Sequence, residues 1–336
     1  MTRFASVAAF DAALADLPAP DMTARAAAAA RQARLTKPHG SLGRLEEIAL
    51  FMAGWQGRAR PRIDAGRVVV FAGNHGVAAR GVSAYPADVT AQMVANFMNG
   101  GAAINALAGA AGLSLAVVPL ALDRPTGDIT RAPAMGEAEC LDALNAGAAA
   151  VTPGLDLLVP GDMGIGNTTP AAALCAASFG GDAAAWVGPG TGVTGAALAA
   201  KVAAVNAALA LHRDAVTPFE RLRRLGGREI AAIAGAVLAA RHARVPVLLD
   251  GFIAGAALAP LAAARPAVLD HVLAGHCSAE PGHARLLDRF GLAPLLTLGM
   301  RLGEGSGAAL AAGIVRAALA AHDGMATFDE AGVSAA

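Results

Sequence analysis

The stretch "LDLLVPGDMGIGNTT" at residues 155–169 decides which fold this chain can adopt. It runs from continuous apolar residues into a glycine-rich polar turn, and an alanine-rich segment follows. A run that is apolar at nearly every position, and not at alternate ones, predicts a strand that is covered on both faces, as in a parallel sheet flanked by helices.

The same succession of apolar run, polar turn and alanine-rich segment recurs along the chain. The other apolar runs are "RVVVFAG" (67–73), "LSLAVVPLAL" (113–122), "AAAWVGPG" (183–190), "VPVLLDGF" (245–252) and "HVLAGHC" (271–277). We therefore predict an α/β fold with a doubly wound, mostly parallel, Rossmann-like sheet.

Two helices are expected before the sheet, at 22–35 and 41–54, and Pro38 breaks the chain between them. With the alanine-rich segment after Glu304 they form either a small helical domain or a dimerisation layer. The predicted division is an N-terminal helical segment (1–62), an α/β substrate-binding domain (63–285), and a C-terminal helical segment (286–336) that carries the catalytic loop and joins the small domain.

The composition argues for a small-molecule partner. Lys plus Arg and Asp plus Glu are 26 each, so the net charge is zero and the chain lacks the basic surplus of a nucleic-acid or anionic-membrane binder. The apolar run at 106–122 is shorter than the ~20 residues of a membrane span.

Asp11 and Asp16 interrupt the apolar N-terminus, which argues against a signal peptide and for a cytoplasmic location. Cys140, Cys175 and Cys277 are odd in number and far apart, as buried thiols would be.

In a doubly wound sheet, ligands bind beyond the carboxyl ends of the strands, where this chain places its glycine-rich turns. The turn at 161–169 resembles a phosphate cradle, with Gly164, Gly166, Asn167 and Thr168, although Thr168 and Thr169 would equally cap the next helix. A second turn, with Gly190, Thr191 and Gly192, makes one anion pocket the favoured interpretation. Lys201 adds a point charge there or is an exposed helix lysine.

Three further positions have two interpretations each. His75 follows a strand and either contacts substrate or is structural. Asp250 ends an apolar strand, where an aspartate binds a sugar hydroxyl, orients a nearby group, or caps a helix. His276 and His283 flank Cys277, but no third ligand has a recognised spacing, so we expect no metal.

Glu304 stands between Gly303 and Gly305 with apolar residues on both sides. Loss of solvation would raise the pKa of this carboxyl and make it a proton acceptor near neutral pH. Alternatively it accepts backbone N–H groups at the start of the following helix and stays ionised.

Long ordered strings resemble one family, the nicotinate-nucleotide–dimethylbenzimidazole phosphoribosyltransferases of cobalamin nucleotide-loop assembly. They are "TKPHGSLGRLEEIA" (36–49), "NHGVAARGVSAYPADVTAQMVANFMNGGAAINALA" (74–108), "GDMGIGNTTPAAAL" (161–174), "GPGTGV" (188–193), "GGREIAAIAGAVLAARHARVPVLLDGFIAGAA" (226–257) and "GHCSAEPGHARLLDRFGLAPLLTLGMRLGEGSGAALA" (275–311).

The resemblance implies transfer of the 5-phosphoribosyl group of nicotinate mononucleotide to 5,6-dimethylbenzimidazole, giving α-ribazole 5′-phosphate and nicotinate. Glu304 would be the general base, no cofactor would be needed, and a homodimer is implied. Asp162 and Lys201 would lie near the ribosyl phosphate, which we expect to be bound also by Asp250, Ser278, Gly303 and the glycine turns. The ring slot would hold His75, Ser83, Tyr85, Gln92, Met163 and Leu302.

Two positions depart from the family pattern. Asn74 stands where many relatives have Asp, and Asp162 stands where they have Glu. Two other functions remain open on the sequence alone: an N-glycosidase, in which water replaces the aromatic base, and a nucleotide-sensing protein that uses the same phosphate turns.

Overall fold

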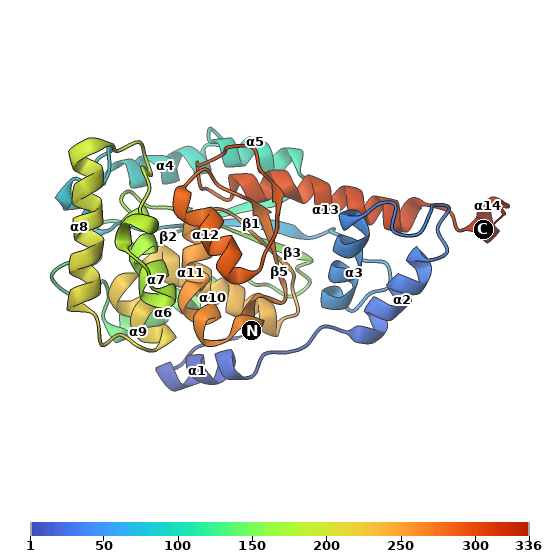
Figure 1. The fold of residues 1–336 in the computed structure, drawn as a ribbon, viewed down its shortest axis with the longest axis horizontal. Helices are drawn as coiled ribbons and strands as arrows, with labels where there is room; N and C mark the ends of the chain where they lie inside the picture. The colour runs from blue at the N-terminus through green and yellow to red at the C-terminus, as the bar shows by residue number, and fades with distance from the viewer. Residues whose placement is uncertain (1, 335–336) are drawn as a thin grey trace.

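A six-stranded sheet organises the computed structural model, which describes residues 2–334 (Figure 1). The strands are β1 (Gly66–Ala72), β2 (Ser114–Pro119), β3 (Leu157–Met163), β4 (Val247–Leu249), β5 (Val272–His276) and β6 (Pro294–Leu296). Their order is β2-β1-β3-β4-β5-β6, and every neighbouring pair is parallel. This confirms the predicted α/β class. The winding reverses between β1 and β3, which is where folds of this kind open a crevice for ligands.

Helices cover both faces of the sheet (Figure 1). They are α1 (Val7–Ala15), α2 (Met22–Gln32), α3 (Arg44–Gln56), α4 (Val89–Met98), α5 (Ala103–Ala110), α6 (Glu137–Ala149), α7 (Thr168–Phe179), α8 (Gly195–Leu211), α9 (Pro218–Leu225), α10 (Arg228–His242), α11 (Phe252–Ala264), α12 (Pro281–Phe290), α13 (Ser306–Gly324) and α14 (Phe328–Ala331), with short 3₁₀ turns at Gly76–Arg80, Ala183–Ala185 and Pro266–Leu269.

Strand β1 shows why its sequence is apolar throughout. Val69 and Phe71 belong to the core beneath α10 and α11, whereas Val68 and Val70 belong to the core beneath α5 and α13. Because successive side chains of a strand point to opposite faces, a strand with two covered faces needs apolar residues at every position.

Two expectations about strands were wrong. Residues 183–190 form a 3₁₀ turn and a loop, because Trp186 is fully buried as a single anchor, with its Nε1 donating to Gly180 O at 2.9 Å. The sequence prediction also omitted β6, a three-residue edge strand whose residues are only half-buried. An apolar run indicates burial, but its length alone does not indicate a strand.

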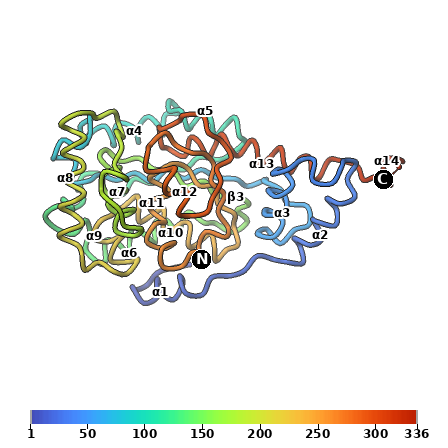
Figure 2. Tube along the Cα trace, in the orientation of Figure 1, coloured from blue at the N-terminus to red at the C-terminus, as the bar shows by residue number. Residues whose placement is uncertain are grey.

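The N-terminal helices α2 and α3 lie beside the C-terminal half of α13 (Figure 2). Arg31 of α2 donates to the carbonyls of His322, Asp323 and Met325, each at 2.9 Å. Helix α13 packs on α3 and, through its first turns, on β5, so it links this helical end to the sheet. Helix α1 lies apart from α2 and α3, against α9.

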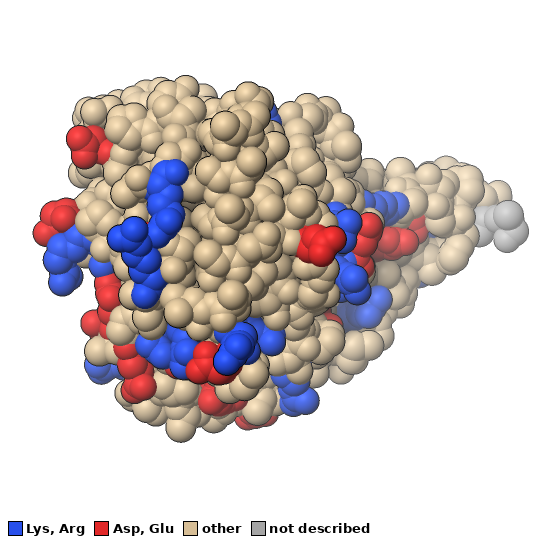
Figure 3. All heavy atoms as spheres, turned by 60° about the vertical axis from the view of Figure 1, so that its left-hand side comes forward, with Lys and Arg blue, Asp and Glu red and all other residues tan. Residues whose placement is uncertain are grey.

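Acidic and basic side chains are interspersed on the face shown in Figure 3, and a broad central area of that face carries neither. None of the helices in the described part of the chain combines the length and apolar composition that crossing a bilayer requires.

Candidate functional site

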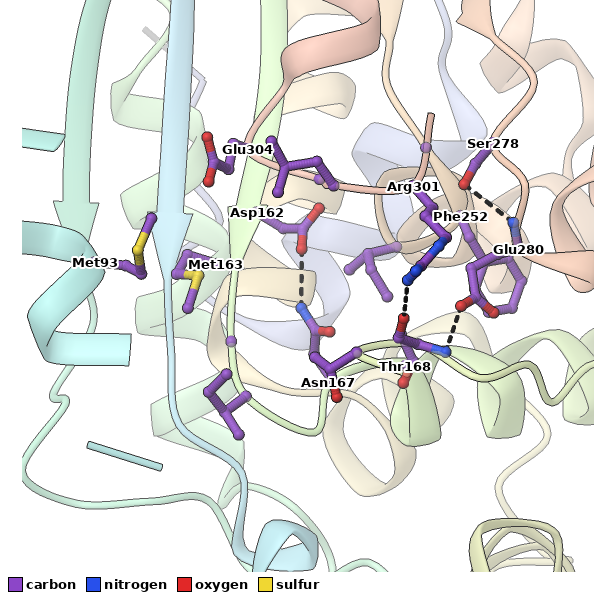
Figure 4. Close-up of a pocket in the computed structure, with 18 of the residues that line it drawn as sticks. Met93, Asp162, Met163, Asn167, Thr168, Phe252, Ser278, Glu280, Arg301 and Glu304 are labelled. Atoms are coloured by element: carbon purple, nitrogen blue, oxygen red, sulfur yellow. Dashed lines mark hydrogen bonds between the residues drawn. The ribbon is translucent and has the colours of Figure 1, made fainter. Parts of the chain in front are cut away.

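A cavity of about 540 Å³ opens at the carboxyl edge of the sheet (Figure 4). Its walls come from the segments that follow β1, β3, β4, β5 and β6. The lining residues are Tyr85, Val89, Met93, Asp162, Met163, Gly164, Ile165, Asn167, Thr168, Gly190, Thr191, Gly251, Phe252, Ile253, His276, Ser278, Glu280, Arg301, Leu302, Gly303 and Glu304.

One side of the cavity is suited to an anion. The N-termini of α7, α11 and α12 all meet its wall, at Asn167 and Thr168, at Gly251 and Phe252, and at Glu280. Unpaired N–H groups and the helix dipole at such N-termini favour a phosphate or a carboxylate.

Three charged side chains hold the loop of residues 188–190 that closes this side. Lys201 Nζ donates to Gly188 O at 2.8 Å. Arg301 Nη1 donates to Gly190 O at 2.9 Å, and Glu280 accepts from Gly190 N (Figure 4). Lys201 is fully buried, so it is not the exposed helix lysine that the sequence left open. Burial lowers the pKa of its ammonium to about 8, against the opposing charge of Glu280.

The opposite side of the cavity is apolar. It is lined by Val89 and Met93 of α4, by Met163 at the end of β3 and by Leu302 after β6. Figure 4 shows Met93 and Met163 on the side away from Glu280 and Arg301. Tyr85 and Leu302 are more than half exposed and stand at the mouth. A flat aromatic ring fits such a slot.

A strap formed by residues 83–85 rests on the second glycine turn. Thr191 Oγ1 lies 3.1 Å from Ser83 Oγ and accepts from Ala84 N at 3.1 Å. These contacts join the apolar side of the cavity to the anion side.

Glu304 is held between the two sides in an unusual backbone conformation. Gly303, Glu304 and Gly305 all have positive φ, of 86°, 65° and 85°. The turn lies so close to β3 that a Cβ on Gly161 would stand 2.5 Å from the Glu304 carbonyl carbon and oxygen. Glu304 N donates to Asp162 O at 3.1 Å, and this bond fixes the turn on the strand end.

The Glu304 side chain is 4% exposed, and its Oε2 accepts from Ile104 N at 3.3 Å. Ile104 is the second residue of α5, so the carboxyl lies at the N-terminus of a neighbouring helix and not at that of its own. Burial raises the pKa of Glu304; the hydrogen bond from Ile104 opposes this, and the charge of Asp250 adds to it.

Asp162 lies next to Glu304 on the cavity wall. Its Oδ2 accepts from Asn167 Nδ2 at 2.9 Å (Figure 4). Burial raises its pKa to about 8, helped by the charges of Asp250, Glu229 and Glu304 and opposed by the Asn167 hydrogen bond. Two neighbouring carboxyl groups therefore both favour the protonated form relative to exposed acids.

The structure brings twelve of the predicted site residues to the cavity wall. They are Tyr85, Asp162, Met163, Gly164, Asn167, Thr168, Gly190, Thr191, Ser278, Leu302, Gly303 and Glu304.

Seven others lie outside the lining: His75, Ser83, Gln92, Gly166, Gly192, Lys201 and Asp250. His75 is buried behind Gly164, with Nε2 2.5 Å from Glu229 Oε1. Gln92 is exposed on α4, and its neighbour Met93 faces the cavity instead. Lys201 contacts Gly188 and Ser83 contacts Thr191, so both are linked to the cavity through the loop of residues 188–192.

Nine lining residues were not among the predicted substrate-site residues: Val89, Met93, Ile165, Gly251, Phe252, Ile253, His276, Glu280 and Arg301. The spacing of Val89 and Met93, four residues apart, was a readable signal for one helix face. Nothing in the local sequence around Arg301 indicates that its guanidinium reaches the 188–190 loop.

His276 and His283, considered for a metal, are buried close together with ring centroids 6.0 Å apart. His283 Nδ1 accepts from Ser278 N at 2.8 Å, which fixes its tautomer and orients the turn. Within residues 2–334, no group of three or more His, Cys, Asp or Glu side chains is arranged to hold a metal ion.

A parallel sheet with an anion cradle, an apolar slot and a buried carboxyl between them forms a site of the class that binds a phosphate-bearing small molecule beside a flat ring. In agreement with this class, a family model described as "Phosphoribosyltransferase" matches residues 17–333.

Named relatives narrow the class. Nicotinate-nucleotide–dimethylbenzimidazole phosphoribosyltransferase of Novosphingobium aromaticivorans is 70% identical over 99% of both chains. The enzyme of the same name from Mesorhizobium japonicum is 60% identical over 98% of this chain and 99% of its own. The crystal structure of CobT from Thermus thermophilus superposes with a TM-score of 0.88 at 45% identity, covering 94% of this chain and 100% of that one. The chain therefore belongs to the nicotinate-nucleotide–dimethylbenzimidazole phosphoribosyltransferase family of enzymes.

Proposed function

We propose that this enzyme transfers the 5-phosphoribosyl group of nicotinate mononucleotide to 5,6-dimethylbenzimidazole, in the assembly of the cobalamin nucleotide loop. The products are α-ribazole 5′-phosphate and nicotinate. The observation that supports this best is the position of Glu304, a buried carboxyl between an anion cradle and an apolar slot.

In the proposed reaction, one ring nitrogen of dimethylbenzimidazole attacks C1′ of the ribose. The bond from C1′ to nicotinate breaks, and its electron pair stays on the pyridine nitrogen. The proton on the other benzimidazole nitrogen passes to the Glu304 carboxylate. The raised pKa of Glu304 makes it a suitable acceptor near neutral pH.

The donor phosphate is assigned to the N-terminus of α7 and the 188–192 loop, which Lys201 supports from beneath. The acceptor ring is assigned to the slot of Tyr85, Met93, Met163 and Leu302. Holding both substrates in one cavity turns a bimolecular attack into a step between fixed neighbours.

The test is nicotinate release from nicotinate mononucleotide, measured with and without dimethylbenzimidazole. Release that depends on the acceptor supports transfer, whereas release at the same rate without it indicates an N-glycosidase, and tight binding without any release indicates a sensor. Glu304→Gln should keep the KM for both substrates and lower kcat by about 10²–10⁴-fold, the range for removing a general base. Turnover close to that of the wild type would refute the assignment of the base.

A homodimer in the cytoplasm is part of the same proposal. Leu310 and Ile314, one turn apart on α13, are more than a third exposed, and an uncharged helix face of this kind is suited to a second copy. Sedimentation equilibrium tests the dimer: a monomer at micromolar concentration would contradict it.

A further inference from the structure

Asp250 contacts the turn that carries Glu304 and not the cavity. It follows β4, is 1% exposed, and is absent from the cavity lining. Its Oδ2 accepts from Gly305 N at 3.1 Å, and its Oδ1 accepts from Ala308 N at 2.9 Å.

These two N–H groups belong to the start of α13. Gly305 is the N-cap residue of that helix and has no side chain to accept a hydrogen bond from the first turn. Asp250 supplies the missing acceptor from a different element of the fold. The carboxylate therefore does for α13 what an N-cap aspartate does for its own helix.

The turn needs such support because of its backbone. Glu304 has a Cβ yet adopts a φ of 65°, between two glycines that are also left-handed. Residues with side chains persist in this conformation only where their surroundings enforce it. Asp250 holds the turn on its C-terminal side, and Asp162 O holds it at Glu304 N.

His276 limits the ways in which Asp250 can move. Its Nε2 lies 3.4 Å from Asp250 Oδ1, and within residues 2–334 neither ring nitrogen makes a hydrogen bond. A Cβ on Gly307 would overlap the ring, so the imidazole is packed directly against α13. Asp250 is thus enclosed by α13 on one side and by His276 on another.

We propose that Asp250 is a positioning residue, whose carboxylate fixes the left-handed Gly303-Glu304-Gly305 turn and so aims Glu304 into the cavity, and that it is not a ligand of the ribosyl group. The proposal rests on the function of Glu304 as the base.

A second effect follows from charge. The groups that face Glu304 are Asp250, Asp162 and the N–H of Ile104, and His276 faces Asp250 from β5. The negative charge of Asp250 raises the pKa of Glu304. Removing this charge should therefore lower that pKa, so that the acid limb of the kcat profile moves to lower pH.

The variant Asp250→Asn tests this, with Asp156→Asn as its matched control. Asp156 is also buried and also accepts two backbone N–H groups, from Asp64 and Ala65 at 3.0 Å each, but it precedes β3 at the opposite edge of the sheet. Both variants should lose thermal stability. Asp250→Asn leaves one backbone N–H facing an amide NH₂ group, because its two N–H donors bind different oxygens. Asp156→Asn keeps one oxygen for both backbone donors but turns its NH₂ group toward Arg58 Nη1, which donates to the other oxygen at 3.0 Å.

We expect Asp250→Asn to lower kcat by at least about 10²-fold, the effect of a misplaced catalytic group. The KM for nicotinate mononucleotide should stay within threefold of the wild-type value, and the acid limb should shift to lower pH. Asp156→Asn should keep the wild-type kcat and pH profile. A rise in the KM for nicotinate mononucleotide at unchanged kcat would overturn the proposal in favour of a ligand role, and behaviour like that of Asp156→Asn would show a merely structural one.

Amide hydrogen exchange separates this proposal from the proposed function. Asp250→Asn should speed exchange at Gly305 and Ala308 by at least tenfold relative to amides elsewhere in α13. If the wild-type enzyme releases no nicotinate, the proposed reaction is refuted. The exchange rates at Gly305 and Ala308 still test whether Asp250 fixes the turn. Unchanged exchange at both amides would refute the positioning role whatever the reaction.

Discussion

Replacing Gly161 by Ala should damage catalysis as well as stability. Gly161 lies in β3, directly beneath the Glu304 turn. A Cβ there would stand 2.5 Å from the Glu304 carbonyl carbon and oxygen and 2.7 Å from Gly305 N. These are backbone atoms, so no side-chain rotation relieves the conflict.

The size of the effect follows from these distances. Non-bonded carbon atoms prefer about 3.5 Å or more, so the turn must move by about 1 Å. A displacement of about 1 Å at a catalytic group costs about 10²-fold in rate, or about 2.7 kcal/mol in activation free energy. Overpacking of this kind lowers the free energy of unfolding by about 1–3 kcal/mol.

Nicotinate release under saturating substrates measures kcat, and urea unfolding measures stability. The control is Gly66→Ala in β1, where a Cβ would meet the Leu113 and Ile63 side chains at the far edge of the sheet. That variant should lose stability and keep kcat within twofold of the wild type. If Gly161→Ala also keeps kcat within twofold, the contact between β3 and the turn does not position Glu304, and the reasoning fails.

Three further predictions concern the remaining walls of the cavity. Lys201→Met should raise the KM for nicotinate mononucleotide by about tenfold at pH 7, because the charged hydrogen bond to the loop of residues 188–190 is lost. In the wild type this KM should rise as pH passes about 8, where Lys201 loses its proton, and the variant should lack that rise. Thr191→Val removes both hydrogen bonds to the strap of residues 83–85 and should raise the KM for dimethylbenzimidazole by about threefold to tenfold, whereas a change in the KM for nicotinate mononucleotide alone would contradict the strap. Burial raises the pKa of Asp162 from 3.8 to about 8, so between these pH values the folded state keeps a proton that the unfolded state has lost. The stability of the wild type therefore falls as pH rises through this range. Urea unfolding should show that Asp162→Asn gains stability over the wild type and that the gain grows from about pH 4 to about pH 8, whereas a difference that does not change with pH would refute the raised pKa.

Much of the fold could be predicted because a strand that is buried on both faces is apolar at nearly every position. The runs at 67–73, 113–122, 155–162, 245–252 and 271–277 each cover all or nearly all of a strand of the sheet. The run at 183–190 failed because one buried tryptophan can make a loop as apolar as a strand. Strand β6 was missed because only three residues pair, at a half-buried edge.

The candidate site could be predicted where function depends on local backbone. Gly164, Asn167 and Thr168 follow β3, whose end the apolar run reveals, and they reach the cavity. Residues that act through tertiary contacts could not be assigned in the same way. Asp250 stands at a strand end as a sugar ligand would, but its partners are backbone groups 55 and 58 residues away.

The charged groups around the cavity suit two parts of the proposed reaction: the negative phosphate of the donor and the positive charge that develops at C1′. Three helix N-termini favour the negative phosphate, and the carboxyl groups of Asp162 and Glu304 lie beside them on the cavity wall. Burial raises the pKa of both carboxyl groups and the charge of Asp250 adds to each shift, and positive charge developing at C1′ would reverse this and favour their ionised forms. The carboxyl groups would then stabilise an oxocarbenium-like state more than the bound donor, which is the condition for accelerating the step. Asn74 fits this balance, since its amide donates to Leu122 O behind the cavity and adds no further charge where carboxyl groups are already close together.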